Sequence, residues 1–182
     1  MSLREVQNLL ARVYTDENLR RAFLSEPAKI GREYDLTENE IVELASVLPE
    51  ELNFFADSLF HKRLREVEKL LPRSKQILSA DFENHFRAFS AFFLPVSIKK
   101  HLEDAVQFSD FLIKHKIEVD WLKDLIRYEQ ANLIFHGYGK KFLFRKFKFN
   151  IKEIIRKGAQ TRRKPSIALW FRSGGKIRHF VW

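Results

Sequence analysis

Basic and aromatic side chains alternate in the last quarter of the chain, and these residue types suit chemistry with an anionic partner. Residues 137–182 hold fourteen lysines and arginines but one acid, Glu153, which gives a net charge of +13, whereas residues 1–136 carry −4. Four rings lie among these cations: Phe142, Phe144, Phe147 and Phe149. Cations neutralise phosphates, and aromatic rings can stack on unpaired bases. Because solvated protein faces normally mix both charge signs, the excess predicts an anionic partner.

The chemistry of the cations leaves the class of that partner open. Nucleic acid, an acidic peptide and an acidic protein surface would all be attracted by such a segment, as would the acidic helices of a second copy of this chain. We expect the binding residues to be the cations on or beside the predicted strands: Lys146, Lys148, Arg162, Arg163, Lys164, Arg172 and Arg178.

Strand-like alternation indicates how this segment folds. From Lys146 to Lys152 apolar and polar residues alternate, which predicts a half-buried strand with Phe147 and Phe149 on the inner face and cations on the outer face. Residues 166–172 and 176–182 flank Ser173-Gly174-Gly175, a pattern typical of a β-hairpin. Residues 151–157 fit either a short helix or a strand. If the three strands carry their cations outward, the outer face is a basic plate.

The sequence contains none of the common enzyme signatures. The chain has no cysteine, no phosphate-binding glycine loop, no nucleophile elbow and no His-Glu-x-x-His pair. Asp81 with His85 and His101 with Asp104 have helical spacing, but a metal needs three or four ligands, so we interpret both as solvent-facing polar pairs. We therefore predict no catalytic residue, no metal site and no cofactor, and hence that the protein is not an enzyme.

Polar residues inside the last predicted helix have a structural interpretation. Arg127, Tyr128 and Glu129 lie within a strongly apolar stretch. A buried Glu or Tyr could act as an acid or base, but such residues more often anchor helix packing through hydrogen bonds.

Helical periodicity runs through residues 3–136. The strongest stripe extends from Leu52 to Leu71, and Pro72 ends it. A second stripe places Phe82, Phe86, Phe89 and Phe93 on one face. We expect further boundaries at caps and breakers, namely Asp16, Gly31, Thr37 with Glu40, Pro49, Ser97, Asp120 and Gly137.

These patterns predict an α+β fold that is mainly α: a bundle of about seven helices over residues 1–136, then a small three-stranded antiparallel sheet over residues 137–182 that packs on the bundle. The chain has 182 residues, of which 45% are hydrophobic, so it can build a core. It has no apolar stretch long enough to span a membrane, and we expect a cytoplasmic protein. The oligomeric state is left open.

Two segments carry a family resemblance. Leu70-Leu71-Pro72-Arg73-Ser74-Lys75-Gln76-Ile77-Leu78 followed by Asp81-Phe82-Glu83 resembles a bacterial family named as a DNA-binding domain, and residues 124–131 resemble its Asp-x-Ala-Arg-x-Glu-Trp-Ala helix, with Gln130 in place of the tryptophan. The strands beginning at Pro165-Ser166 and ending in Trp182 also fit its layout, so the likeness covers about 49–182. The resemblance implies a partner protein of multinuclear iron oxidative enzymes that helps to bind a ribosomal precursor peptide.

A second resemblance concerns the first helices. Phe23-Leu24-Ser25-Glu26-Pro27 with Leu36-Thr37-Glu38 is similar to the helical module of small subunits of extradiol ring-cleaving dioxygenases and of some precursor leader peptides. Those subunits cover an active site and supply no metal ligand. Both resemblances imply a non-catalytic accessory role. We therefore expect an interaction module that binds a protein or peptide through its basic β surface, with nucleic-acid binding by the same cations as the alternative.

Overall fold

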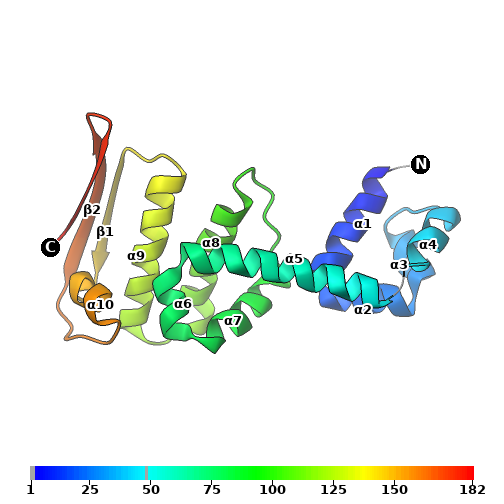
Figure 1. Ribbon diagram of the computed structural model, residues 1–182, viewed down its shortest axis with the longest axis horizontal. Coiled ribbons are helices and arrows are strands. Elements are labelled where there is room, and N and C mark those ends of the chain that lie inside the picture. The colour runs from blue at the N-terminus through cyan, green and yellow to red at the C-terminus, as the bar shows by residue number, and fades with distance from the viewer. Residues whose placement is uncertain (1–2, 48) are drawn as a thin grey trace. The chain divides into compact units, whose positions relative to one another are not determined.

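The computed structural model describes residues 3–47 and 49–182, and Figure 1 labels its elements. The α-helices are α1 (Leu3–Thr15), α2 (Glu17–Ser25), α3 (Pro27–Glu33), α4 (Glu38–Ala45), α5 (Pro49–Leu70), α6 (Pro72–Leu78), α7 (Ala80–Ser90), α8 (Lys100–Phe111), α9 (Asp120–Gly137) and α10 (Ile151–Lys157). A π-helical turn, η1 (Leu112–Lys116), follows α8, and the strands are β1 (Phe142–Phe147), β2 (Ser166–Ser173) and β3 (Lys176–Val181). The α+β, mainly α fold class is confirmed.

The number of helices is larger than the expected seven. Nine α-helices precede β1 in the described residues, and α10 lies between β1 and β2. The difference arises partly at Pro27, which begins a separate short helix, α3, because proline fits the first helical turn, where its missing N–H is not needed.

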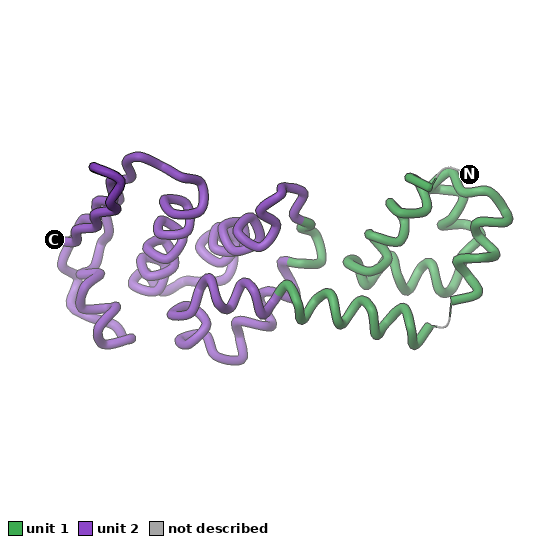
Figure 2. The backbone as a smooth tube through the Cα atoms, turned by 45° about the horizontal axis from the view of Figure 1, so that its top comes forward, with its two compact units in different colours: residues 1–63, 90–94 green, residues 64–89, 95–182 purple. Residues whose placement is uncertain are grey.

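The described chain divides into two compact units, coloured separately in Figure 2. Unit 1 comprises residues 1–63 and 90–94, and unit 2 comprises residues 64–89 and 95–182. The change in composition near Gly137 lies inside unit 2.

Unit 1 is built on helices whose caps were predicted. Asp16 accepts hydrogen bonds from the backbone N–H groups of Asn18 and Leu19, and Thr37 with Glu40 forms a complete capping box. The core behind these helices consists of Leu9, Val13, Phe23, Ile30, Leu36, Ile41 and Leu52.

Gly31 does not break a helix, contrary to expectation. It lies inside α3 and is buried. A Cβ atom at this position would lie 2.4 Å from Cγ1 of Ile41, so glycine is present because α3 and the Ile41 side chain of α4 approach closely.

Unit 2 has an aromatic core under its helices. Phe82, Phe86 and Phe89 of α7 are buried and contact Phe108 of α8, with ring centroids 5.2–5.4 Å apart. Pro72 ends α5 as predicted, and it is also the first residue of α6.

Two predicted caps in unit 2 are wrong. Helix α8 begins at Lys100 rather than after Ser97, and the Ser97 backbone N–H instead donates to the Glu103 carboxylate. Helix α9 is preceded by Val119, and its first residue, Asp120, contacts Lys148.

The sheet has the order β1-β2-β3 with antiparallel pairing throughout, and the predicted hairpin is confirmed. Gly174 and Gly175 form its turn with φ of 56° and 74°, values that glycine adopts without strain. The strand expected over residues 146–152 is wrong in extent, because β1 ends at Phe147. Residues 151–157 are the helix α10, where the Asn150 side chain accepts from the Glu153 backbone N–H at 3.2 Å.

Within the described ranges, every helix is too short or too polar to cross a lipid bilayer.

Candidate interaction surfaces of the C-terminal sheet

The inner face of the sheet packs on α9. Trp170 of β2 is fully buried, and its indole N–H donates to the Asn132 side chain of α9 at 2.7 Å. Tyr128 of α9 lies 5.8 Å from the Trp170 ring and 6.3 Å from the Phe147 ring, centroid to centroid. Figure 1 shows α9 beside the strands. This contact fixes which way each strand residue points, because side chains alternate between the two faces.

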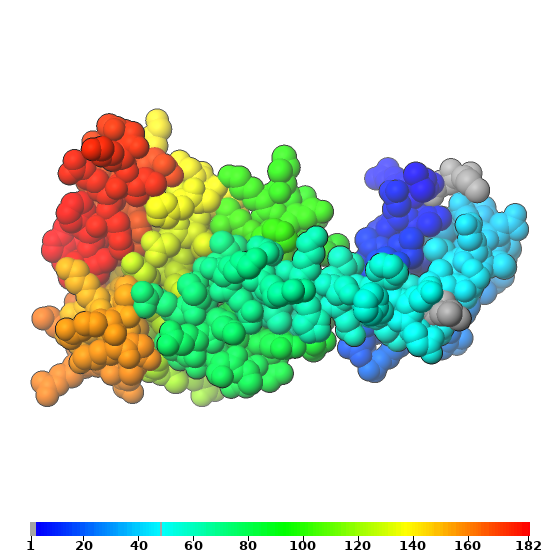
Figure 3. Space-filling model, viewed as in Figure 1, coloured from blue at the N-terminus to red at the C-terminus, as the bar shows by residue number. Residues whose placement is uncertain are grey.

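The outer face of the sheet is aromatic and apolar. The register pairs Phe142 with Phe171, Phe144 with Leu169, and Leu169 with Phe180, and backbone hydrogen bonds pair Ile167 with Trp182. We call this set the aromatic outer face: Phe142, Phe144, Ile167, Leu169, Phe171, Phe180 and Trp182. In Figure 3 the red atoms of the hairpin lie at the surface of the protein.

Four rings of the aromatic outer face are strongly exposed. The exposed fractions are 62% for Phe142, 38% for Phe144, 43% for Phe180 and 58% for Trp182. The rings of Phe171 and Phe180 are nearly parallel, with centroids 6.0 Å apart, and Phe180 and Trp182 are related in the same way at 5.7 Å. Exposed apolar patches of this kind mark interaction sites in soluble proteins.

The predicted cations do not share one face, unlike the expected basic plate. Lys146 and Arg178 lie on the aromatic outer face, at the register positions opposite Ile167 and Phe171. Arg172 has the opposite parity, and its guanidinium lies 5.3 Å from the Phe135 ring of α9 and donates to the Lys140 carbonyl. The plate prediction failed because Arg172 lies on the face that packs on α9, because Arg162, Arg163 and Lys164 lie in a loop before β2, and because rings share the outer face with Lys146 and Arg178.

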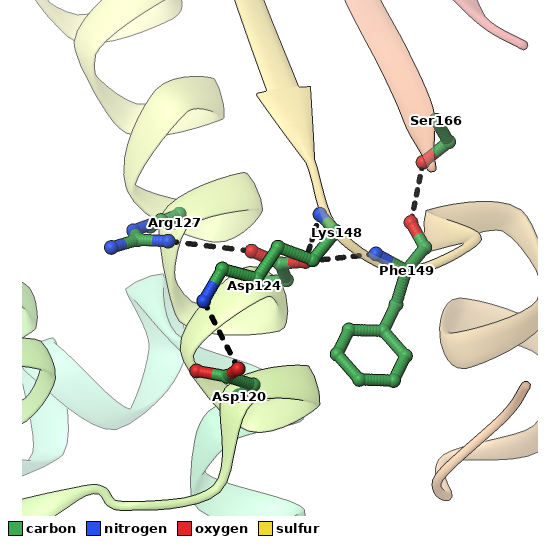
Figure 4. Close-up of polar contacts among 6 residues, drawn as sticks. All are labelled: Asp120, Asp124, Arg127, Lys148, Phe149 and Ser166. Carbon is green, nitrogen blue, oxygen red and sulfur yellow. Dashed lines mark hydrogen bonds and ion pairs between the residues drawn. The ribbon is translucent and has the colours of Figure 1, made fainter. Parts of the chain in front are cut away.

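Lys148 is engaged with α9, as Figure 4 shows. Its Nζ lies 3.0 Å from the carboxylate of Asp120, and its backbone N–H donates to Asp124 at 2.6 Å. The ammonium group holds the pKa of Asp120 below its ordinary value. Lys148 therefore has an internal partner and is the least available of the predicted cations.

Arg162, Arg163 and Lys164 lie in the loop between α10 and β2. All three are exposed, whereas Thr161 beside them is buried. Arg162 and Arg163 line a hollow of about 680 Å³ with Phe149, Lys157, Gln160 and Thr161. The cations that line the hollow are Lys157, Arg162 and Arg163. No ion pair within 4 Å joins any of them to a carboxylate of the described chain.

The buried phenylalanines of the alternating segment were predicted correctly. Phe147 and Phe149 are 4% and 8% exposed. The exposed rings were not predicted, although the spacing of the phenylalanines indicates them. Phe142 and Phe144 are an odd number of residues away from Phe147, so in one strand their side chains lie on the opposite face of the sheet.

The polar residues inside α9 act as structural anchors, as interpreted from the sequence. The Glu129 carboxylate is buried and accepts from the backbone N–H groups of Arg73 at 2.8 Å and Ser74 at 2.9 Å, at the start of α6. Burial raises the pKa of Glu129. Glu129 thus caps a neighbouring helix, where a carboxylate also meets the positive end of the helix dipole.

No three His, Cys, Asp or Glu side chains of residues 3–47 and 49–182 converge as metal ligands would. The interpretation of His101 and Asp104 as a solvent-facing polar pair is wrong, because Asp104 is buried while His101 is exposed.

No protein-family model, curated protein or solved structure matches this chain.

Proposed function

We propose that the protein is a non-catalytic interaction module that binds a protein partner through the aromatic outer face. The observation that carries the proposal is the exposure of four rings on one side of a sheet whose other side is already packed on α9. Burying such rings against a partner removes a large apolar area from water, and aromatic residues are the usual anchors of protein interfaces.

The charges around this face favour an acidic partner. Lys146 and Arg178 lie on the same face as the rings. Lys176 is two residues from Arg178 in β3, next to the hairpin turn, and so lies on that face too. A polar, charged rim around an apolar centre is the ordinary anatomy of an interface, and rim charges increase association rates and partner selectivity. The proposed partner surface is therefore apolar at its centre and carries Asp or Glu at its border. The resemblance of residues 49–182 to accessory proteins of peptide modification supports the same class of function.

Affinity capture from the native host tests this proposal. The double variant Phe142→Ser/Trp182→Ser removes the two most exposed rings of the face, and we expect it to lose the captured partner. Phe54→Ser is the matched control, because Phe54 is 70% exposed on α5 in unit 1. Equal recovery of the same partner by the wild type and the double variant would reject the aromatic outer face as the interface.

Single-stranded nucleic acid is the second candidate, favoured by the near-parallel rings of Phe171, Phe180 and Trp182 beside Arg178. Bases stack on exposed rings while cations contact the backbone. Electrophoretic mobility shifts with single- and double-stranded DNA and RNA at increasing salt distinguish the two candidates, since phosphate binding weakens log-linearly with salt concentration. Absence of any shift at low salt would remove this candidate.

A further inference from the structure

Thr161 lines the hollow between α10 and β2, and its hydroxyl is buried. Thr161 is 8% exposed, and its Oγ1 has no hydrogen-bond partner among the described residues. Its neighbours Gln160 and Arg162 are exposed, so Thr161 is the inward-pointing residue of an otherwise solvated loop. An unpaired buried hydroxyl is unfavourable, and valine would fill the same volume without that penalty. The hydroxyl at this position therefore requires an explanation.

The side chains around Thr161 are donors. Lys157, Arg162 and Arg163 carry three positive charges, and Gln160 adds an amide group. None of the six residues that line the hollow is an acid. Guanidinium and ammonium groups with hydroxyl and amide donors form the set that binds tetrahedral oxyanions, and arginine does so with two parallel hydrogen bonds.

One carboxylate near the hollow is already compensated. Asp120 is close enough to Arg163 for that cation to help lower its pKa, but the contact partner of Asp120 is Lys148, at 3.0 Å. Arg163 makes no ion pair within 4 Å in the described chain. Its guanidinium is therefore available to an external anion.

Phe149 also lines the hollow, and its backbone is held in place. Its backbone N–H donates to Asp124 at 3.0 Å, and its carbonyl accepts from the Ser166 hydroxyl at 2.6 Å (Figure 4). Because Phe149 is apolar, an organic group attached to a bound anion can contact the part of its side chain that lines the hollow.

We propose that this hollow, which we call the Thr161 hollow, binds a phosphate group, with the Thr161 hydroxyl, Arg162 and Arg163 as its principal contacts. The site is distinct from the aromatic outer face: its residues are Phe149 before α10, Lys157 at the end of α10 and four residues of the following loop, none of which lies on the exposed side of the sheet. The protein then has two surfaces of different chemistry, one for an apolar partner and one for a phosphate.

An NMR titration of the ¹⁵N-labelled full chain with inorganic phosphate tests the proposal, at ionic strength held constant with sodium chloride. We expect the amide signals of residues 157–163 to shift and saturate. Thr161→Val should weaken phosphate binding by about tenfold, which corresponds to the loss of one hydrogen bond to a charged group, while Thr161→Ser should bind as the wild type does. Arg163→Gln provides a second variant that leaves the buried loop residue in place, and it should also weaken binding.

Matched controls lie on the other surface. Lys146→Gln and Arg178→Gln each remove one cation from the aromatic outer face, and we expect both to bind phosphate as the wild type does. A parallel titration with phenyl phosphate identifies the source of the group: tighter binding than inorganic phosphate indicates an ester that packs on Phe149, and equal or weaker binding indicates free phosphate.

Three results would overturn the proposal. The first is the absence of saturable shifts around Thr161, and the second is unchanged phosphate affinity in both Thr161→Val and Arg163→Gln. The third is a lower melting temperature of Thr161→Val than of the wild type in phosphate-free buffer, because that would show that the hydroxyl has a structural partner. Since this site does not depend on the aromatic outer face, loss of phosphate binding and loss of partner capture are separate outcomes.

Discussion

The Asp124 carboxylate accepts a hydrogen bond from the backbone N–H of Lys148 at 2.6 Å, and this contact fastens the end of β1 to α9. The same carboxylate accepts from the Phe149 N–H at 3.0 Å and lies 3.4 Å from the Arg127 guanidinium. Lys146, just before this contact, lies on the aromatic outer face, and Phe149, just after it, lines the Thr161 hollow. The contacts of Asp124 therefore hold both the end of β1 and Phe149, which lines the Thr161 hollow.

Replacing Asp124 with asparagine should destabilise unit 2. Both backbone N–H groups donate to one carboxylate oxygen, Oδ2, so an asparagine oxygen can still accept from them, but the neutral amide weakens both hydrogen bonds and places its NH₂ group against the Arg127 guanidinium in place of Oδ1. We expect a loss of about 1–3 kcal/mol in the free energy of unfolding. Urea denaturation followed by circular dichroism measures the loss. Glu118→Gln, at an exposed position in the same unit, is the control and should unfold as the wild type does. Equal stability of Asp124→Asn and Glu118→Gln would contradict this role for Asp124.

The two faces of the sheet should respond differently to substitution. Phe142→Ser and Trp182→Ser change exposed rings and should alter the free energy of unfolding by no more than about 0.5 kcal/mol, as surface substitutions generally do. Trp170→Ala removes a fully buried ring on the opposite face and should cost about 3–5 kcal/mol. Thermal and urea unfolding of the three variants provides the comparison. A large loss of stability in Trp182→Ser would show that its face is packed rather than free.

The sequence predicted local structure at several points where nearby residues determine it. The Thr37–Glu40 capping box, the proline at the start of α5 and the Gly174-Gly175 turn depend on side chains and backbone angles within a few residues, and all three are present. The fold class followed from the same kind of pattern.

What the sequence did not predict depends on contacts between distant residues. Gly31 lies in a helix because of Ile41, and Asp120 contacts Lys148 instead of capping its own helix. The first strand was expected over residues 146–152, whereas β1 covers Phe142–Phe147 and α10 begins at Ile151. For this reason the rings of the aromatic outer face were not expected beside Lys146 and Arg178, and the buried hydroxyl of Thr161 had no distinguishing pattern.

Glu129 should make stability depend on pH. Its pKa is raised above the ordinary value of 4.5 by burial, so the folded protein binds this proton more tightly than the unfolded chain does. The stabilising contribution of the protonated group is complete below pH 4.5 and is lost as the pH rises through the raised pKa. The difference in unfolding free energy between the wild type and Glu129→Gln should therefore be largest at acidic pH and should shrink towards neutrality.

Urea denaturation of both proteins over a series of pH values measures this dependence. Glu153→Gln is the control for the removal of a carboxylate elsewhere in the unit, because Glu153 lies on α10 and is only partly buried. A wild-type advantage over Glu129→Gln that grows as the pH rises would mean that the hydrogen bonds from Arg73 and Ser74, rather than burial, dominate the pKa of Glu129.

Gly31→Ala should destabilise unit 1, although alanine is the better helix former. In a helix interior the change from glycine to alanine ordinarily gains about 1 kcal/mol. Here the added Cβ would lie 2.4 Å from Cγ1 and 2.8 Å from Cδ1 of Ile41, and crowding of this kind in a packed core costs about 1–3 kcal/mol. We expect the crowding to exceed the gain.

A double-mutant cycle with Ile41→Ala separates the two effects. Ile41 is 4% exposed, and shortening it removes the atoms that the new Cβ would meet. In the Ile41→Ala background, Gly31→Ala should be neutral or stabilising, since only the helix propensity then remains. If the substitution lowers the unfolding free energy equally in both backgrounds, then close approach to Ile41 is not the reason for glycine at this position.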